Sequence, residues 1–212
     1  MIITEKFKSE IEQYHKNRRN TENSATKAGW KNRDAQETRF NQLFRSFELI
    51  DGDSILDVGC GLGDLFKYLK DKYCRTKFNY SGVDILFEMI NFAENEYKDT
   101  IFQKIDSISE IESSDYIVAS GIFNLKNSAG NDEWLNYIYE TVSIMFNKSI
   151  KGISFNCLSS FSDSEFMKDE LYYANPMQIF EFCAKNLSEN LTLYHDYRQY
   201  DFTISIKKYA LS

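Results

Sequence analysis

A glycine-rich turn inside SILDVGCGLGDLFKYL, residues 54–69, constrains the fold more than any other stretch. A short apolar run reaches Val58, and Gly59, Gly61 and Gly63 follow at once, before a stretch with helical spacing. Glycine adopts positive φ and leaves the main chain bare, so a ligand can contact the backbone. In open α/β sheets ligands bind where the strands end, so this turn predicts a ligand site.

The chain alternates between short apolar runs and helical patterns, which predicts parallel strands joined by helices. Two final β runs, separated only by RQY, predict an antiparallel hairpin. We therefore expect an α/β fold, a doubly wound domain with a mostly parallel seven-stranded sheet that ends in this hairpin. With one proline and no linker, the sequence favours one α/β domain over residues 51–212, preceded by a helical annex or lid over residues 1–50. Strands are expected at 54–58, 78–85, 100–105, 115–120, 151–158, 190–197 and 201–209, and helices at 5–19, 40–47, 65–73, 86–97, 134–146 and 175–187.

The spacing of the glycines narrows the class of ligand. The turn reads G-x-G-x-G, and Asp64 stands where a dinucleotide fingerprint has its third glycine, so a pyrophosphate would be repelled. No Gly-Lys-Ser/Thr occurs, which excludes a P-loop. Asp84 ends the second expected strand and can accept both ribose hydroxyls. Asp106 follows the third strand and can accept from an adenine amine or cap a helix. These acids predict a nucleoside ligand without phosphates.

ILDVGCGLGDL, GVDI and DYIVASGIFN resemble the motifs of class I S-adenosylmethionine-dependent methyltransferases, whose domain is Rossmann-like. The resemblance covers about residues 30 to 208 and implies S-adenosyl-L-methionine as cofactor and S-adenosyl-L-homocysteine as product. It implies that the glycines hold the methionine part and that Asp84 holds the ribose. Asp106, with the Ser107 amide, would hold the adenine. The other residues implied at the cofactor are Asp57, Gly59, Cys60, Gly61, Ile85, Ser120 and Gly121.

The two ends of the chain resemble a narrower group of small bacterial methyltransferases. Trp30, Gln36 and Arg39 match a segment that closes over the cofactor in that group, and Arg39 would meet its carboxylate. YYANP and HDYRQYDFT match the C-terminal part, except that Arg198 stands where the group has proline. That departure brings a cation to the acceptor side.

The acceptor side offers weaker candidates. His195 beside Asp196 predicts a general base, although a solvent-facing imidazole is the alternative. Tyr173 and Asn124 are further catalytic candidates. A local excess of positive charge between residues 15 and 33 predicts an entrance for an anionic acceptor. The alternative is that these charges form an ordinary solvated surface. The residues expected to bind the acceptor are Tyr14, Arg18, Arg19, Tyr172 and Arg198.

These patterns predict methyl transfer to a small anionic acceptor, such as a phosphorylated or nucleotide-linked sugar of surface (capsule) polysaccharide synthesis. A net charge of −7 disfavours nucleic acid, and no apolar run suits a membrane span. Four scattered cysteines and two histidines predict a cytoplasmic chain without a metal site, as a monomer or homodimer. The alternatives are a cofactor-binding regulatory subunit without catalysis, or a transferase that uses another adenosyl nucleoside.

Overall fold

The computed structural model describes residues 5–16 and 32–209. Within them a seven-stranded sheet has the order β3-β2-β1-β4-β5-β7-β6. The first five strands are parallel, and β7 pairs antiparallel with both β5 and β6. This confirms the predicted doubly wound sheet with its C-terminal antiparallel hairpin. The strands are β1 (Ser54–Val58), β2 (Asn79–Asp84), β3 (Ile101–Lys104), β4 (Ser114–Ala119), β5 (Ser149–Leu158), β6 (Leu191–Tyr194) and β7 (Asp201–Lys207).

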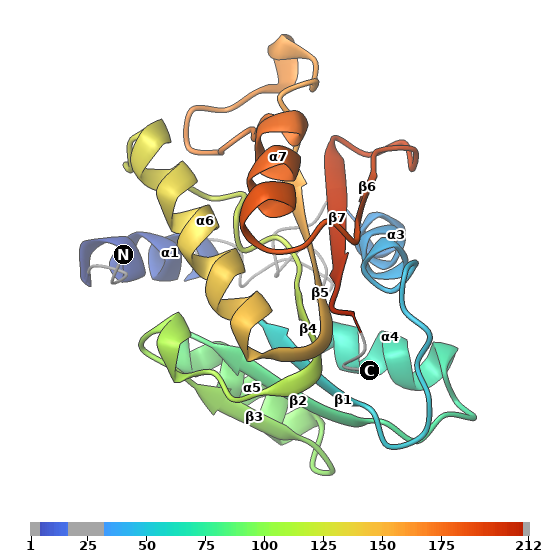
Figure 1. The fold of residues 1–212 in the computed structure, drawn as a ribbon. Helices are drawn as coiled ribbons and strands as arrows, with labels where there is room; N and C mark the ends of the chain where they lie inside the picture. Colours follow the sequence, from blue (N-terminus) through green and yellow to red (C-terminus); the bar gives the residue numbers. More distant parts are fainter. Residues whose placement is uncertain (1–4, 17–31, 210–212) are drawn as a thin grey trace.

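Helices cover both faces of this sheet. Figure 1 shows α6 and α7 side by side on one face, while α3, α4 and α5 pack on the other, where their apolar residues form a shared cluster. The α-helices are α1 (Glu5–Lys16), α3 (Arg33–Leu43), α4 (Asp64–Lys72), α5 (Phe87–Glu96), α6 (Asn131–Lys148) and α7 (Pro176–Asn186). Two short 3-10 helices, η1 (Ile108–Glu110) and η2 (Ser164–Phe166), lie in connections. No helix of the described part of the chain is long and apolar enough to span a bilayer.

The helix boundaries follow local chemistry. Asn175 caps α7, since its side chain accepts from the amides of Met177 and Gln178, and Pro176 occupies the first helical position, as predicted. The helix predicted around residues 40–47 ends earlier, at Leu43, where α3 gives way to a turn. Phe44 and Phe47 still lie buried, because they pack on the sheet from this turn.

Aromatic packing fixes α6 on the sheet. Trp134 is fully buried, and its indole nitrogen donates to the carbonyl of Phe123 at 2.8 Å. Phe123 in turn packs edge-on against Phe155 of β5. A buried aromatic of this size contributes on the order of 3–5 kcal/mol against truncation to alanine. The β4–β5 region that borders the site is therefore rigid.

The final hairpin differs in one respect from the sequence-based expectation. Its strands are shorter, so the connection spans residues 195–200 rather than three residues. Tyr194 pairs with Thr203 as the last pair of the β6–β7 ladder. The longer connection places His195 and Arg198 in a loop instead of a strand, and Arg198 takes φ 51 there.

Candidate active site

The glycine turn is tied to β2 and open on its other side. The amides of Gly59 and Cys60 both donate to the carbonyl of Val83, at 2.8 and 3.0 Å. Gly59 has φ 75, and a Cβ there would overlap the Ile122 side chain. Gly61 has φ 53, and a Cβ there would meet nothing within 4 Å. The first glycine is thus required by packing, whereas the second leaves space for a ligand.

That space belongs to a cavity of about 320 Å³ beside the carboxyl ends of β1, β2 and β4. Residues of α1, α3, the glycine turn and the loops after β2, β3, β4 and β5 surround it. The volume lies within the range of small-molecule sites. The cavity is lined by Phe7, Ile11, Tyr14, Gln36, Arg39, Phe40, Asp57, Val58, Gly59, Cys60, Gly61, Leu62, Asp64, Leu65, Val83, Asp84, Ile85, Leu86, Met89, Ile105, Ile108, Ser120, Gly121, Ile122, Asn124, Leu125, Tyr137, Leu158 and Leu171.

Asp84 is held by the backbone at the end of β2. One carboxylate oxygen accepts from the Gly61 amide at 3.0 Å, and the other accepts from the Leu86 amide at 2.9 Å. These bonds fix the carboxylate at the cavity wall, and each oxygen of a carboxylate can accept two hydrogen bonds. Asp84 can therefore receive the two vicinal hydroxyls of a ribose, the role that the sequence predicts.

Asp57 at the end of β1 is a buried acid. The Tyr80 hydroxyl donates to its carboxylate at 2.6 Å. The pKa of Asp57 is raised to about 7, mainly by burial; the hydrogen bond from Tyr80 opposes this shift, and the nearby charges of Asp84 and Asp64 add to it. The Gln36 side chain donates to Asp64 at 3.0 Å. Three carboxyl groups thus line one cavity, an arrangement that favours a cationic ligand over an anionic one.

Arg39 lines the cavity, but its guanidinium is engaged inside the protein. Its Nε donates to Asp201 at 2.9 Å, its Nη2 forms a second short bond to the same carboxylate oxygen, and its Nη1 donates to the Ala35 carbonyl at 2.7 Å. Asp201 is fully buried at the start of β7. The resemblance implies that Arg39 meets the carboxylate of the cofactor. In the structure the charge of Arg39 is already compensated by Asp201, so Arg39 is not an unpaired cation at the cavity.

Helix α1 covers the cavity with an apolar stripe of which the sequence analysis named only Tyr14. Phe7, Ile11 and Tyr14 all line the cavity, and the Phe7 ring lies 5.0 Å from that of Trp134. Their i, i+4, i+7 spacing is the signal that would have revealed them. Ser128 donates to Glu10 at 2.8 Å, which anchors α1 to the loop after β4.

The carboxylate of Asp106 does not lie in the cavity. It is exposed and pairs with Lys104 at 2.7 Å and with Lys8 of α1 at 2.8 Å. Hydrogen bonds from these lysines lower the pKa of Asp106 to about 2. Ser107 caps η1 and does not line the cavity either, so its neighbours Ile105 and Ile108 form that wall.

Residues after β4 are positioned by Asn156 of β5, which the sequence analysis missed although it is a polar residue inside an apolar run. Its side chain accepts from the Gly121 amide at 2.8 Å and donates to Ser120 at 3.0 Å. Asn124 also lines the cavity, and its oxygen accepts from the Leu158 amide at 3.1 Å. Burial raises the pKa of Tyr137, a further lining residue that the sequence analysis missed, to about 12.

The structure separates four of the acceptor-side candidates from the cavity, whereas Tyr14 and Asn124 line it. Tyr172 is buried beside α7, and Tyr173 accepts from the Lys168 amide at 3.1 Å; neither lines the cavity. His195 and Arg198 line a second hollow beyond α3. The predicted pairing of His195 with Asp196 is wrong, because Asp196 pairs with Arg45 at 2.6 Å.

Several expectations fall on other parts of the chain. Trp30, Arg18 and Arg19 lie outside the described residues, as does most of the basic stretch. Cys60 lines the cavity and packs on Gly82, where an added Cβ would lie 2.8 Å from the cysteine Cβ. Among residues 5–16 and 32–209, no cluster of three histidine, cysteine or acidic side chains could hold a metal ion.

The chain is 38% identical over 156 residues to the Mycobacterium tuberculosis protein named "putative methyltransferase", and the match covers 73% of this chain and 93% of that protein. No protein-family model matches. A crystal structure of Synechocystis magnesium protoporphyrin IX methyltransferase with bound S-adenosylhomocysteine superposes with a TM-score of 0.66 at 11% identity, over 95% of each chain. An S-adenosylmethionine-dependent methyltransferase of Clostridium acetobutylicum superposes with a TM-score of 0.52 at 15% identity, over 74% of this chain and 85% of that one. The chain therefore belongs to the class I S-adenosylmethionine-dependent methyltransferases.

Proposed function

We propose that this protein transfers the methyl group of S-adenosylmethionine to a small anionic acceptor, such as a phosphorylated or nucleotide-linked sugar of surface polysaccharide synthesis. The observation that carries the cofactor assignment is the open backbone at Gly61 beside the fixed carboxylate of Asp84. The negative lining of the cavity suits a ligand with a net positive charge, as a sulfonium with an amino-acid group has.

The lining residues divide into three proposed parts. Gly59 and Gly61 lie against the methionine portion, and Asp84 holds the ribose. The adenine lies among apolar side chains of the loops after β2 and β3, which takes the place of the expected contact with Asp106. The apolar residues proposed for this slot are Ile85, Leu86, Met89, Ile105 and Ile108.

The sulfonium supplies a good leaving group, so the protein has mainly to align the acceptor and exclude water. Ser120, Gly121 and Asn124 form the proposed wall beside the methyl group, on a loop that Asn156 makes rigid. The high pKa of Tyr137 keeps its hydroxyl protonated at neutral pH, so it can donate to an acceptor oxygen but cannot act as a base.

We further propose that residues 1–50 act as a covering annex to the domain at 51–212. The contacts of α1 support this, because Phe7, Ile11 and Tyr14 close one side of the cavity and Lys8 pairs with Asp106 across its rim. A cover of this kind excludes water from the transfer step.

The proposal that the acceptor is anionic is supported by Arg198, which is exposed and forms no ion pair with a described residue. We expect radiolabel from the cofactor to reach sugar phosphates or nucleotide-linked sugars, and not the matching neutral sugars. Label transfer to neutral sugars alone would contradict the anionic acceptor. Cofactor binding without transfer to any of them would favour the regulatory subunit.

Asp84→Ala tests the cofactor site. We expect calorimetry to show a dissociation constant for S-adenosylmethionine at least about 100-fold weaker, because charge-assisted hydrogen bonds contribute about 1.5–3 kcal/mol each. Exposed Asp99 on the connection after α5 gives the matched control, and Asp99→Ala should bind normally. Equal affinity for both variants would contradict the assignment of Asp84.

A further inference from the structure

The second hollow lies next to the cavity along two segments of the chain. Leu158 lines the cavity, and its neighbour Ser159 lines the hollow; Ala35 faces the hollow, while Gln36 and Arg39 face the cavity. Both therefore open at the carboxyl edge of the sheet, on two sides of the first turns of α3.

Exposed aromatic rings lie at this hollow. Phe161, 66% exposed, and Tyr200, 44% exposed, line it, and Phe166, 59% exposed, is a neighbour of Tyr200. The Phe161 ring lies 5.8 Å from the imidazole of His195, and the Phe166 ring lies 6.3 Å from that of Tyr200. Apolar surface gathered in this way marks a binding site rather than a solvated loop.

The loops that carry the rings are held in place. The Ser159 amide donates to the Tyr200 carbonyl at 2.8 Å, and the Ser160 amide donates to the Ala174 carbonyl at 2.9 Å. The Tyr200 hydroxyl donates to Asp163 at 2.6 Å. The rings are thus positioned before any ligand arrives, which lowers the entropic cost of binding.

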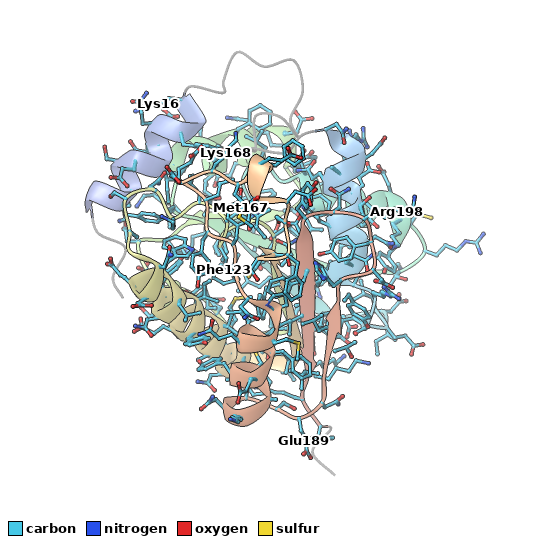
Figure 2. The ribbon with its side chains drawn as sticks, turned by 90° about the horizontal axis from the view of Figure 1, so that it is seen from above. Lys16, Phe123, Met167, Lys168, Glu189 and Arg198 are labelled. Carbon is cyan, nitrogen blue, oxygen red and sulfur yellow. The ribbon has the colours of Figure 1, made fainter. Side chains whose placement is uncertain are left out.

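Two charged side chains line the same hollow, Arg198 and the exposed Asp34. Arg198 has φ 51, a backbone conformation that side-chain-bearing residues rarely adopt, and it forms no ion pair within the described residues. In Figure 2 Arg198 lies on the opposite side of the molecule from Lys16, so it does not belong to the positive charge at the end of α1.

Exposed aromatic rings beside an arginine match a nucleoside phosphate, because a base can stack on an aromatic ring and a guanidinium binds phosphate oxygens in a bidentate manner. We propose that the second hollow binds the nucleoside diphosphate portion of a nucleotide-linked acceptor, and so holds its reacting portion toward the cofactor cavity. This inference rests on the proposed methyl transfer and names its acceptor class.

The test is calorimetry of UDP, CDP, GDP, ADP and dTDP with the full chain saturated with S-adenosylhomocysteine, which keeps the cavity filled. We expect at least one to bind, and Phe161→Ala and Arg198→Gln each to weaken it by about 5- to 150-fold, since stacking contributes about 1–3 kcal/mol. Phe87→Ala, on a ring 65% exposed in α5, and Arg75→Gln, exposed after α4, are the matched controls and should leave the affinity unchanged.

Three outcomes would overturn the proposal. One is saturation with S-adenosylhomocysteine but no uptake of any nucleoside diphosphate at about 5 mM, a concentration about fivefold above the millimolar affinity of weak complexes. Another is inorganic pyrophosphate binding as tightly as the nucleotides, with no effect of Phe161→Ala. The third is competition between nucleotide and S-adenosylhomocysteine, which would place the nucleotide in the cavity. Failure to bind S-adenosylhomocysteine at all would instead contradict the proposed function.

Discussion

Replacing Asp57 with asparagine should change how the stability of the protein depends on pH. The carboxyl is buried and accepts a bond from Tyr80 at 2.6 Å, and burial, together with the charges of Asp84 and Asp64, raises its pKa from 3.8 to about 7. The folded protein therefore keeps a proton that the unfolded chain releases near pH 4. Because the unfolded state binds fewer protons between these values, the free energy of unfolding falls as pH rises through this window.

The size of the effect follows from the shift. A difference of about 3 pKa units corresponds to about 4 kcal/mol, lost between about pH 4 and pH 7. The asparagine side chain would keep an oxygen that accepts from Tyr80 but cannot ionise. We therefore expect the stability of Asp57→Asn relative to the wild type to rise by about 3 kcal/mol between pH 5 and pH 8, because about two of the three pH units of the window lie above pH 5.

Urea unfolding at pH 5, 6, 7 and 8 measures this difference. Asp115→Asn is the matched control of opposite sign. Although burial raises the pKa of Asp115, hydrogen bonds from Ser54 and the charge of Lys151 outweigh it and lower the pKa overall. Its stabilisation is lost only as pH falls below about 4, so the difference between the wild type and Asp115→Asn should stay constant from pH 5 to pH 8. A constant free-energy difference between wild type and Asp57→Asn from pH 5 to pH 8 would refute the reasoning.

The same acid should couple cofactor binding to proton release. A cation in the cavity favours the ionised form of Asp57, so S-adenosylmethionine should displace part of its proton near pH 7. Calorimetry in buffers with different ionisation enthalpies counts the protons released. We expect a value between zero and one for the wild type and close to zero for Asp57→Asn; equal values in both proteins would contradict the coupling.

Two further substitutions test the turn and its cover. Gly59→Ala should lower the melting temperature and weaken cofactor binding, because the new methyl group overlaps Ile122. The control is Gly52→Ala, where φ is 92 but the space is open, so that it measures the backbone strain alone. An equal drop in melting temperature for both variants would show that the overlap is harmless. Phe7→Ala removes the ring contact with Trp134. It should speed proteolysis within residues 5–16 and dissociation of the cofactor, with little effect on unfolding of the sheet. An unchanged rate of cleavage would show that this ring does not hold α1 in place.

Much of the fold could be predicted because its signals are local. The turn after Val58, the Asn-Pro start of α7 and the period of α6 each depend on neighbours within a few residues. The end of β6 was harder to predict, because apolar and polar residues alternate over the whole of 190–197, as they would in a strand. The strand stops at Tyr194, and the chain then turns away from the sheet. Asp196 pairs there with Arg45, which lies 151 positions earlier in the sequence.

The candidate site shows the same division. Asp84 and the glycines were found because strand ends and turns have sequence signatures. The environment of Asp106 could not be predicted, because Lys8 reaches it from 98 residues away. The pairing of Arg39 with Asp201 crosses 162 residues, and nothing in either local sequence reveals it. A charged residue can thus be located from its own segment, while its partner is set by the tertiary fold.

These distant pairs decide which charges remain to act on ligands. Asp201 neutralises Arg39, Lys8 and Lys104 neutralise Asp106, and Arg45 neutralises Asp196. After these pairs are formed, the carboxyl groups of Asp57, Asp64 and Asp84 line the cavity, while Arg198 and Asp34 line the neighbouring hollow. The acids of the cavity repel an anionic acceptor, whereas Arg198 in the hollow can bind one. Charge reversal at Arg198 would then be expected to weaken acceptor binding without improving that of the cofactor, since the cavity keeps its own acids.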